Sequence, residues 1–119
     1  MSFREILTKL VSDVEGASGA VLMGYDGISI DDYIQDGCSD EIQLLAVEYT
    51  SIIKEVRRAV DVLKTGQMEE LSLATNRSRI VMRIVNEDFF VLMVLSVDGN
   101  FGKARYLLKR SVPLLREAL

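Results

Sequence analysis

The chain has 119 residues, a net charge of −4, no histidine and a single cysteine, Cys38. A chain of this length forms one domain with its own core, so we assign residues 1–119 to a single domain. The absence of histidine excludes Ser-His-Asp and Cys-His catalysis and most zinc sites. The acidic balance argues against nucleic acid as the main partner, because phosphate binding needs a basic face.

Targeting and membrane segments are not evident in the sequence. The longest uncharged stretches are residues 16–25 and 89–97, well short of the ~18–20 apolar residues that a membrane span needs. The N-terminus lacks the apolar core of a signal peptide. A lone cysteine cannot form an intrachain disulfide, which fits a reducing compartment. We therefore expect a cytoplasmic protein without a membrane span.

The first half of the chain predicts a helix followed by two strands. Ser2 and Glu5 have the spacing of a capping box, and apolar residues at helical spacing follow over residues 3–15. Residues 19–23 are apolar on both faces, as in a central strand. An Asp-Gly pair then predicts a tight turn into the more polar residues 28–33, which we place at a sheet edge.

A long second helix is predicted over residues 39–64. Ser39 or Asp40 can cap its N-terminus, and Gly66 is expected to close it. One side of this helix is apolar over an arc of about 100°, which should face the sheet. The residues of that side are Ile42, Leu45, Ala46, Tyr49, Ile53, Val56, Val60 and Leu63.

Three further strands and a last helix complete the chain. The strands are expected at residues 68–75, 79–85 and 89–97, with polar turns between them. The final helix should run from about residue 100 to the end, and Pro113 inside it should kink or restart it.

The order of the strands in the sheet can be predicted from which strands are apolar on both faces. Only the first and fifth are apolar on both faces, so they should be neighbours at the centre of an antiparallel sheet ordered 2-1-5-4-3. A helix of about 25 residues spans roughly 37 Å, more than the roughly 24 Å width of five strands, so it can cross between the edges. The predicted fold is α/β, a three-layer α/β/α sandwich with element order α-β-β-α-β-β-β-α.

Three segments carry a resemblance to a known family. Residues 19–28 form an apolar strand that turns at an Asp-Gly pair, Leu44-Leu45-Ala46 begins a long helix, and residues 100–105 read Asn-Phe-Gly-Lys-Ala-Arg. Together, in this order, they resemble the roadblock family of dynein light chains and bacterial MglB-like regulators. The resemblance covers essentially the whole chain and implies a roadblock/profilin-like fold.

The resemblance also implies a function. Family members are dimers whose sheets join through the third strand, with the two long helices antiparallel across the joint. They have no catalysis of their own and act as platforms for Ras-like small GTPases or as adaptors. MglB-like dimers bind the GTP form and stimulate hydrolysis by repositioning the GTPase's own residues. We therefore expect a homodimeric, non-catalytic GTPase regulator in bacterial signalling, either GTPase-activating or state-selective.

Two sets of residues are candidates for these contacts. By match to the family's second helix, Thr50, Lys54 and Arg58 form the GTPase-facing row, and Val47 and Ser51 lie beside them. MglB-like helices carry small residues in this row, so Lys54 and Arg58 depart from the pattern. The second set is the third strand, which would be an aggregation hazard if left unpaired and can instead pair with its twin. Its dimer-edge residues are Glu69, Leu71, Leu73 and Thr75.

Other chemistry is poorly supported. Residues 99–104 lack the spacing of a phosphate loop and its hydroxyl residue. The acids near Asp32 place Ile34 where a calcium ligand is needed, so a solvated turn fits better. Cys38 fits an incidental loop thiol. Arg77 fits a solvated edge or a surface for an acidic partner better than an arginine finger. We assign no catalytic residue, metal or cofactor.

Two alternative functions remain open. The protein can be an adaptor or scaffold dimer that holds partners together without changing hydrolysis. It can also be a small-molecule sensor, since sensor domains share this layering, but a sensor needs a cavity between sheet and helix. The candidate lining here is mostly Ile, Leu, Val and Met, which is typical of a packed core.

Overall fold

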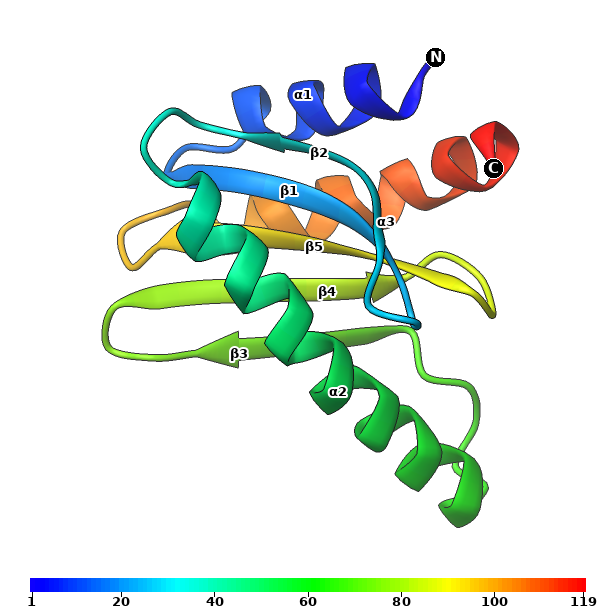
Figure 1. Ribbon diagram of the computed structural model, residues 1–119. Helices are drawn as coiled ribbons and strands as arrows, with labels where there is room; N and C mark the ends of the chain where they lie inside the picture. Colours follow the sequence, from blue (N-terminus) through cyan, green and yellow to red (C-terminus); the bar gives the residue numbers. More distant parts are fainter.

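The computed structural model describes residues 1–119 and contains three helices and a five-stranded antiparallel sheet (Figure 1). The sheet order is β2-β1-β5-β4-β3, so the predicted fold class, element order and strand order are confirmed. In chain order, the elements are α1 (Phe3–Asp13), β1 (Ala17–Gly24), β2 (Ser29–Ile34), α2 (Ser39–Leu63), β3 (Glu70–Ala74), β4 (Ser78–Ile84), β5 (Phe89–Ser96) and α3 (Phe101–Ala118).

The sheet is built around its two most apolar strands. β1 and β5 are neighbours, with Ala20 opposite Met93 and Leu22 opposite Val91. All four of these side chains are buried. β2 and β3 form the two edges because their mixed polar patterns do not suit burial on both faces.

Each face of the sheet has its own core. On one face, α1 and α3 pack with the sheet through buried residues such as Leu7, Leu108 and Leu115. On the other face, Ile42 and Ile53 of α2 join residues of β1, β4 and β5. Figure 1 shows α2 crossing in front of the sheet, with α1 and α3 behind it. None of the three helices combines the length and apolar character that crossing a membrane requires.

The capping box at α1 is present, whereas both expected ends of α2 need correction. Ser2 Oγ accepts from the Glu5 backbone N–H at 3.1 Å, and Glu5 Oε1 accepts from the Ser2 N–H at 3.3 Å. α2 is capped by Cys38 without a side-chain hydrogen bond, because Ser39 and Asp40 already lie inside the helix. Its C-terminal cap is not Gly66 but Lys64, which takes the left-handed conformation with φ of 54°.

Pro113 does not restart α3, contrary to one of the two expected outcomes. The helix continues from Phe101 to Ala118. Pro113 itself is exposed. A backbone carbonyl that loses its partner on the solvent side of a helix can bind water instead, which makes the proline tolerable there.

The C-terminal end of α2 extends past the sheet. Figure 1 shows this end lying beyond β3. We call residues 61–64, which are all exposed and include the cap Lys64, the α2 overhang. Leu63 was expected to face the sheet, but it is 69% exposed because no strand of this chain lies beneath it. Val56 and Val60, on the same side, are only half-buried.

Candidate functional site

The outer face of α2 presents most of the residues expected to contact a GTPase. Val47, Ser51, Lys54 and Arg58 are all exposed. Leu44 and Val62 belong to the same stripe: at 100° per residue, Leu44, Val47, Ser51, Arg58 and Val62 fall within an arc of about 60°. The stripe therefore has apolar ends and a polar middle.

Thr50 does not belong to this face. It is only 4% exposed, and its Oγ1 donates a hydrogen bond to the Ala46 carbonyl at 2.8 Å. It lies four residues after Ala46 and three before Ile53, both of which face the sheet, so helical geometry places it on the inner side. Its expected place in the exposed row is wrong, because the backbone bond satisfies the hydroxyl and permits its burial.

The charges in the middle of the stripe are partly paired. Arg58 Nη2 lies 2.6 Å from Glu55 Oε1, one turn earlier. The hydrogen bond and charge of Arg58 lower the pKa of Glu55, and Glu55 raises the pKa of Arg58. Lys54 has no carboxylate within salt-bridge distance. Both members of the pair are well exposed, so the pair contributes little to stability and remains available to a partner.

β3 is a free edge of the sheet, as expected, but it is shorter than predicted. It pairs only with β4, with Leu71 opposite Met82 and Leu73 opposite Ile80. Leu71 and Leu73 are half-buried against the core beneath α2. Glu69 and Thr75, which were expected in the strand, are exposed and lie just outside its ends.

An ion-pair network fixes the start of β3. Glu70 Oε2 accepts from Arg105 Nη2 at 2.7 Å, and Glu70 Oε1 lies 3.3 Å from Arg83 Nη1. Arg83 also reaches Glu69 at 3.4 Å. The network links β3 to β4 and α3. Because Glu70 and Arg83 are largely buried, their charges are neutralised within the chain rather than at the free edge.

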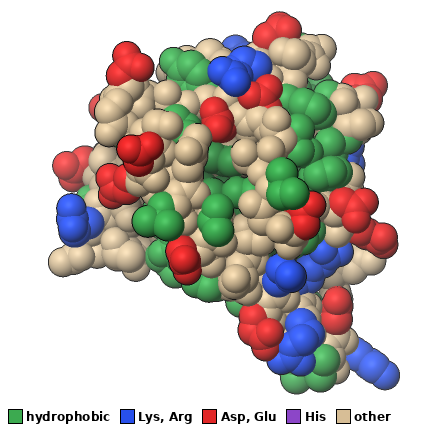
Figure 2. All heavy atoms as spheres, viewed as in Figure 1, with side chains coloured by type: hydrophobic (Ala, Val, Ile, Leu, Met, Phe, Trp, Pro, Cys, Tyr) green, Lys and Arg blue, Asp and Glu red, His purple; other side chains and the backbone are tan.

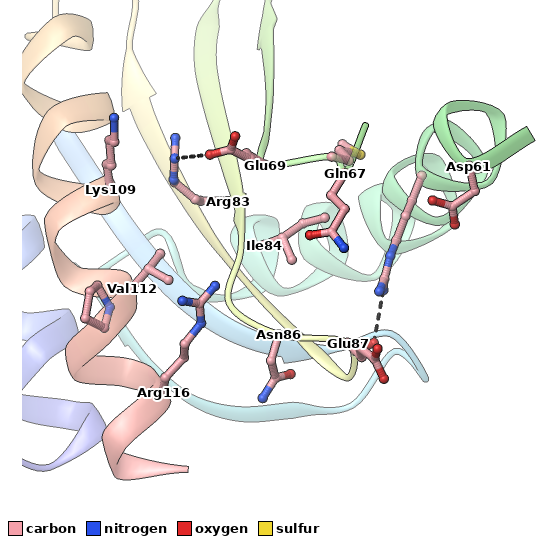
Figure 3. Close-up of a pocket in the computed structure, with 13 residues that line it drawn as sticks. Asp61, Gln67, Glu69, Arg83, Ile84, Asn86, Glu87, Lys109, Val112 and Arg116 are labelled. Atoms are coloured by element: carbon pink, nitrogen blue, oxygen red, sulfur yellow. Dashed lines mark hydrogen bonds and ion pairs between the residues drawn. The ribbon is translucent and has the colours of Figure 1, made fainter. Parts of the chain in front are cut away.

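A polar cavity of about 780 Å³ lies beside this network, between the end of α2, the β3–β4 end of the sheet and α3. Figure 3 shows Lys109, Val112 and Arg116 on the α3 side and Asp61 on the α2 side. Its charged lining residues are Arg57, Asp61, Glu69, Arg83, Glu87, Lys109 and Arg116. This is not the apolar cavity between sheet and helix that a sensor function would need. No sequence motif indicates this cavity, because its residues come from segments far apart in the chain.

Arg57 connects the cavity to the first hairpin. Its Nη1 donates to the Glu87 backbone carbonyl at 3.0 Å, and its guanidinium carbon lies 4.7 Å from the centre of the Tyr25 ring. The Tyr25 hydroxyl is buried without a hydrogen-bond partner. Burial raises the pKa of Tyr25, and the positive charge of Arg57 partly opposes this shift.

Known proteins resemble the chain in both sequence and structure. MglC from Myxococcus xanthus is 40% identical over 100% of both chains, with a TM-score of 0.73. A roadblock/LC7 domain from Streptomyces avermitilis is 14% identical over 98% of this chain and 97% of its own, with a TM-score of 0.85. MglB from Myxococcus xanthus is 16% identical over 98% and 96%, with a TM-score of 0.81.

No family model and no curated protein matches the chain. The two less similar structures share its fold, and the similarity to MglC extends to the sequence over the full length. The chain therefore belongs to the roadblock family, alongside the MglC and MglB proteins.

Proposed function

We propose that the protein is a non-catalytic, homodimeric regulator of a Ras-like small GTPase, acting through the outer face of paired α2 helices. The full-length similarity to MglC and the shared fold with MglB fit a regulator of small GTPases. The observation that carries the proposal is the α2 overhang, an amphipathic helix end that extends past its own sheet with Leu63 uncovered.

The dimer would form through the β3 edge. Pairing β3 with its twin satisfies the free backbone groups of both edges and gives a twofold interface. The sheet would then continue into the partner, and the α2 overhang would lie over the partner's strands. Leu63 shares the inner side of α2 with Ile53, so the partner's sheet would cover the side chain that a single chain leaves exposed.

The GTPase would bind the outer stripe of α2. Figure 2 shows acidic, basic and hydrophobic side chains mixed over α2 and its protruding end. Val47, Ser51, Lys54 and Arg58 would supply the contacts, and any increase in hydrolysis would come from repositioning groups of the GTPase itself. This role requires no nucleophile, base or cofactor from the chain.

One observation favours an adaptor as the second candidate function. Lys54 and Arg58 are bulky, and Arg58 is held by Glu55, whereas close approach to a GTPase is easier over small residues. An adaptor dimer would bind its partners without changing the rate of hydrolysis. A hydrolysis assay with the identified GTPase therefore distinguishes the two functions.

The test begins with the partner and its nucleotide state. Immobilised protein is incubated with host lysate containing either a non-hydrolysable GTP analogue or GDP, and retained proteins are identified by mass spectrometry. We expect a small GTPase that is retained only with the analogue. Retention of no GTPase in either state, while sedimentation shows an intact dimer, would contradict the GTPase assignment and leave the adaptor function.

A further inference from the structure

The last helix is basic within an acidic protein. α3 carries five basic residues and one acidic residue, a net charge of +4, although the whole chain has a net charge of −4. Arg105 is paired with Glu70, and Arg116 donates a hydrogen bond to the Val85 carbonyl. Lys103, Lys109 and Arg110 are exposed and have no carboxylate partner. The outer face of α3 therefore carries uncompensated positive charge.

An apolar groove of about 330 Å³ lies between α1 and α3, and of these three cations only Arg110 lines it, because Lys109 lines the polar cavity described above. Ile6 and Leu10 of α1 form its floor with Leu107 of α3, and Leu114 lies at its border with 43% of its surface exposed. The hydroxyl of Ser111, which also lines the groove, donates to the Leu108 carbonyl at 2.8 Å. The groove consequently offers apolar surface and few free hydrogen-bonding groups.

Cations lie at both borders of the groove. Lys9 on α1 is 3.2 Å from Asp13, a carboxylate that also lines the groove and compensates the charge of Lys9. Arg110 on α3 has no carboxylate partner, and its guanidinium carbon lies 5.7 Å from the centre of the Tyr106 ring. Arg110 is therefore the free charge beside the groove, and an acidic ligand would gain most there.

We propose that this groove binds an acidic amphipathic helix of a partner protein. Apolar side chains three and four residues apart on such a helix would enter the groove, while a flanking Asp or Glu residue would meet Arg110. A lipid surface fits less well, because apolar membrane anchors must protrude, whereas Ile6 and Leu10 are recessed and buried. The site faces away from α2, so the α2 and β3 surfaces remain free (Figure 1).

A designed peptide pair tests the proposal on the full-length protein. The acidic peptide is a helix of about 18 residues with leucines on one stripe and glutamates elsewhere, and its twin carries lysine in place of every glutamate. We expect saturable binding of the acidic peptide only, with backbone amide NMR shifts in α1 and α3. Arg110→Glu and Leu114→Glu should each weaken binding about tenfold.

Lys54→Glu is the matched control, since it reverses an exposed lysine on the opposite face and should leave peptide binding unchanged. Thermal unfolding of each variant checks that the fold is retained. The proposal is wrong if the acidic peptide does not bind, if the lysine twin binds equally well, or if the shifts lie in α2. Binding to phosphatidylglycerol vesicles that Arg110→Glu abolishes, without peptide binding, would assign the face to a membrane instead.

Discussion

The two faces of the sheet are covered in different ways. Behind it, α1 and α3 together with the sheet enclose 16 buried apolar residues, whereas the α2 side has a cluster of 10. The larger cluster is complete within one chain. The smaller cluster ends at an uncovered helix, where Leu63 and Val62 are both mostly exposed. The α1–α3 side is therefore packed without a second copy of the chain, whereas the α2 side leaves apolar side chains that a second copy could cover.

The largest effect is expected from the core of the two-helix side. Leu108 is fully buried between α3 and the sheet. Leu108→Ala should lower the free energy of unfolding by about 2–5 kcal/mol, because the removed methyl groups leave a cavity. Urea unfolding followed by circular dichroism measures the loss. Tyr106→Ala, at an exposed position on the same helix, is the control and should change stability far less.

The proposed dimer is tested by a substitution at the exposed end of α2. Leu63→Glu places a charge where the partner's sheet is expected, so it should weaken dimerisation by about 2–3 kcal/mol, or roughly 30- to 150-fold. Sedimentation should then show the 13.3 kDa chain rather than twice that mass. Leu114→Glu, an exposed leucine on the other face, should leave the dimer intact. If both variants weaken dimerisation equally, the proposal that only the α2 side forms the dimer is wrong.

A smaller effect is expected in GTPase binding. Arg58→Glu replaces the paired cation with a second carboxylate beside Glu55, and it should weaken binding of the GTP-loaded partner about tenfold without changing stability. Lys9→Glu alters the equivalent local pair with Asp13 on the opposite face and should have no effect. Fluorescence titration measures both. Unchanged binding by Arg58→Glu would place the GTPase site elsewhere.

The smallest expected effect concerns Tyr25. Its folded-state pKa is raised by burial, so the phenol should titrate later than an exposed tyrosine. The associated stability is present below the unfolded pKa of about 10 and is lost as pH rises through the folded pKa. Ultraviolet absorbance from pH 9 upward, compared between the wild type and Tyr25→Phe, identifies this titration. The substitution itself should be nearly neutral at pH 7, because the buried hydroxyl has no hydrogen-bond partner to lose.

The sequence predicts the fold well where local chemistry and periodicity act together. Residues 19–23 of β1 and 89–95 of β5 are apolar on both faces, which is enough to place these strands at the centre and derive the sheet order. The spacing of Ser2 and Glu5 predicts the hydrogen bonds of the capping box, because this motif involves only residues close together in sequence.

Sequence patterns do not predict the structure at positions where burial or contacts between distant segments decide which way a side chain faces. The match to the family's second helix places Thr50 on the exposed side, but a backbone bond to Ala46 permits its burial. The uncovered position of Leu63 depends on where the sheet ends, which the helical pattern does not contain. The α1–α3 groove joins residues about 100 positions apart in sequence, so no local motif could have revealed it.

If two copies pair as proposed, the α2 overhang would also make the protein sensitive to its own concentration. In a lone chain, the end of α2 at Val62 and Leu63 has little tertiary packing and should fray, since most helical stability in proteins comes from a packed face. In a dimer, the partner's sheet would hold them. Hydrogen exchange of the backbone amides near Leu63 would therefore slow as the concentration rises, while exchange in the core of α3 would stay constant. This helix end would then order only when two copies meet, so that the regulatory surface is completed by assembly itself.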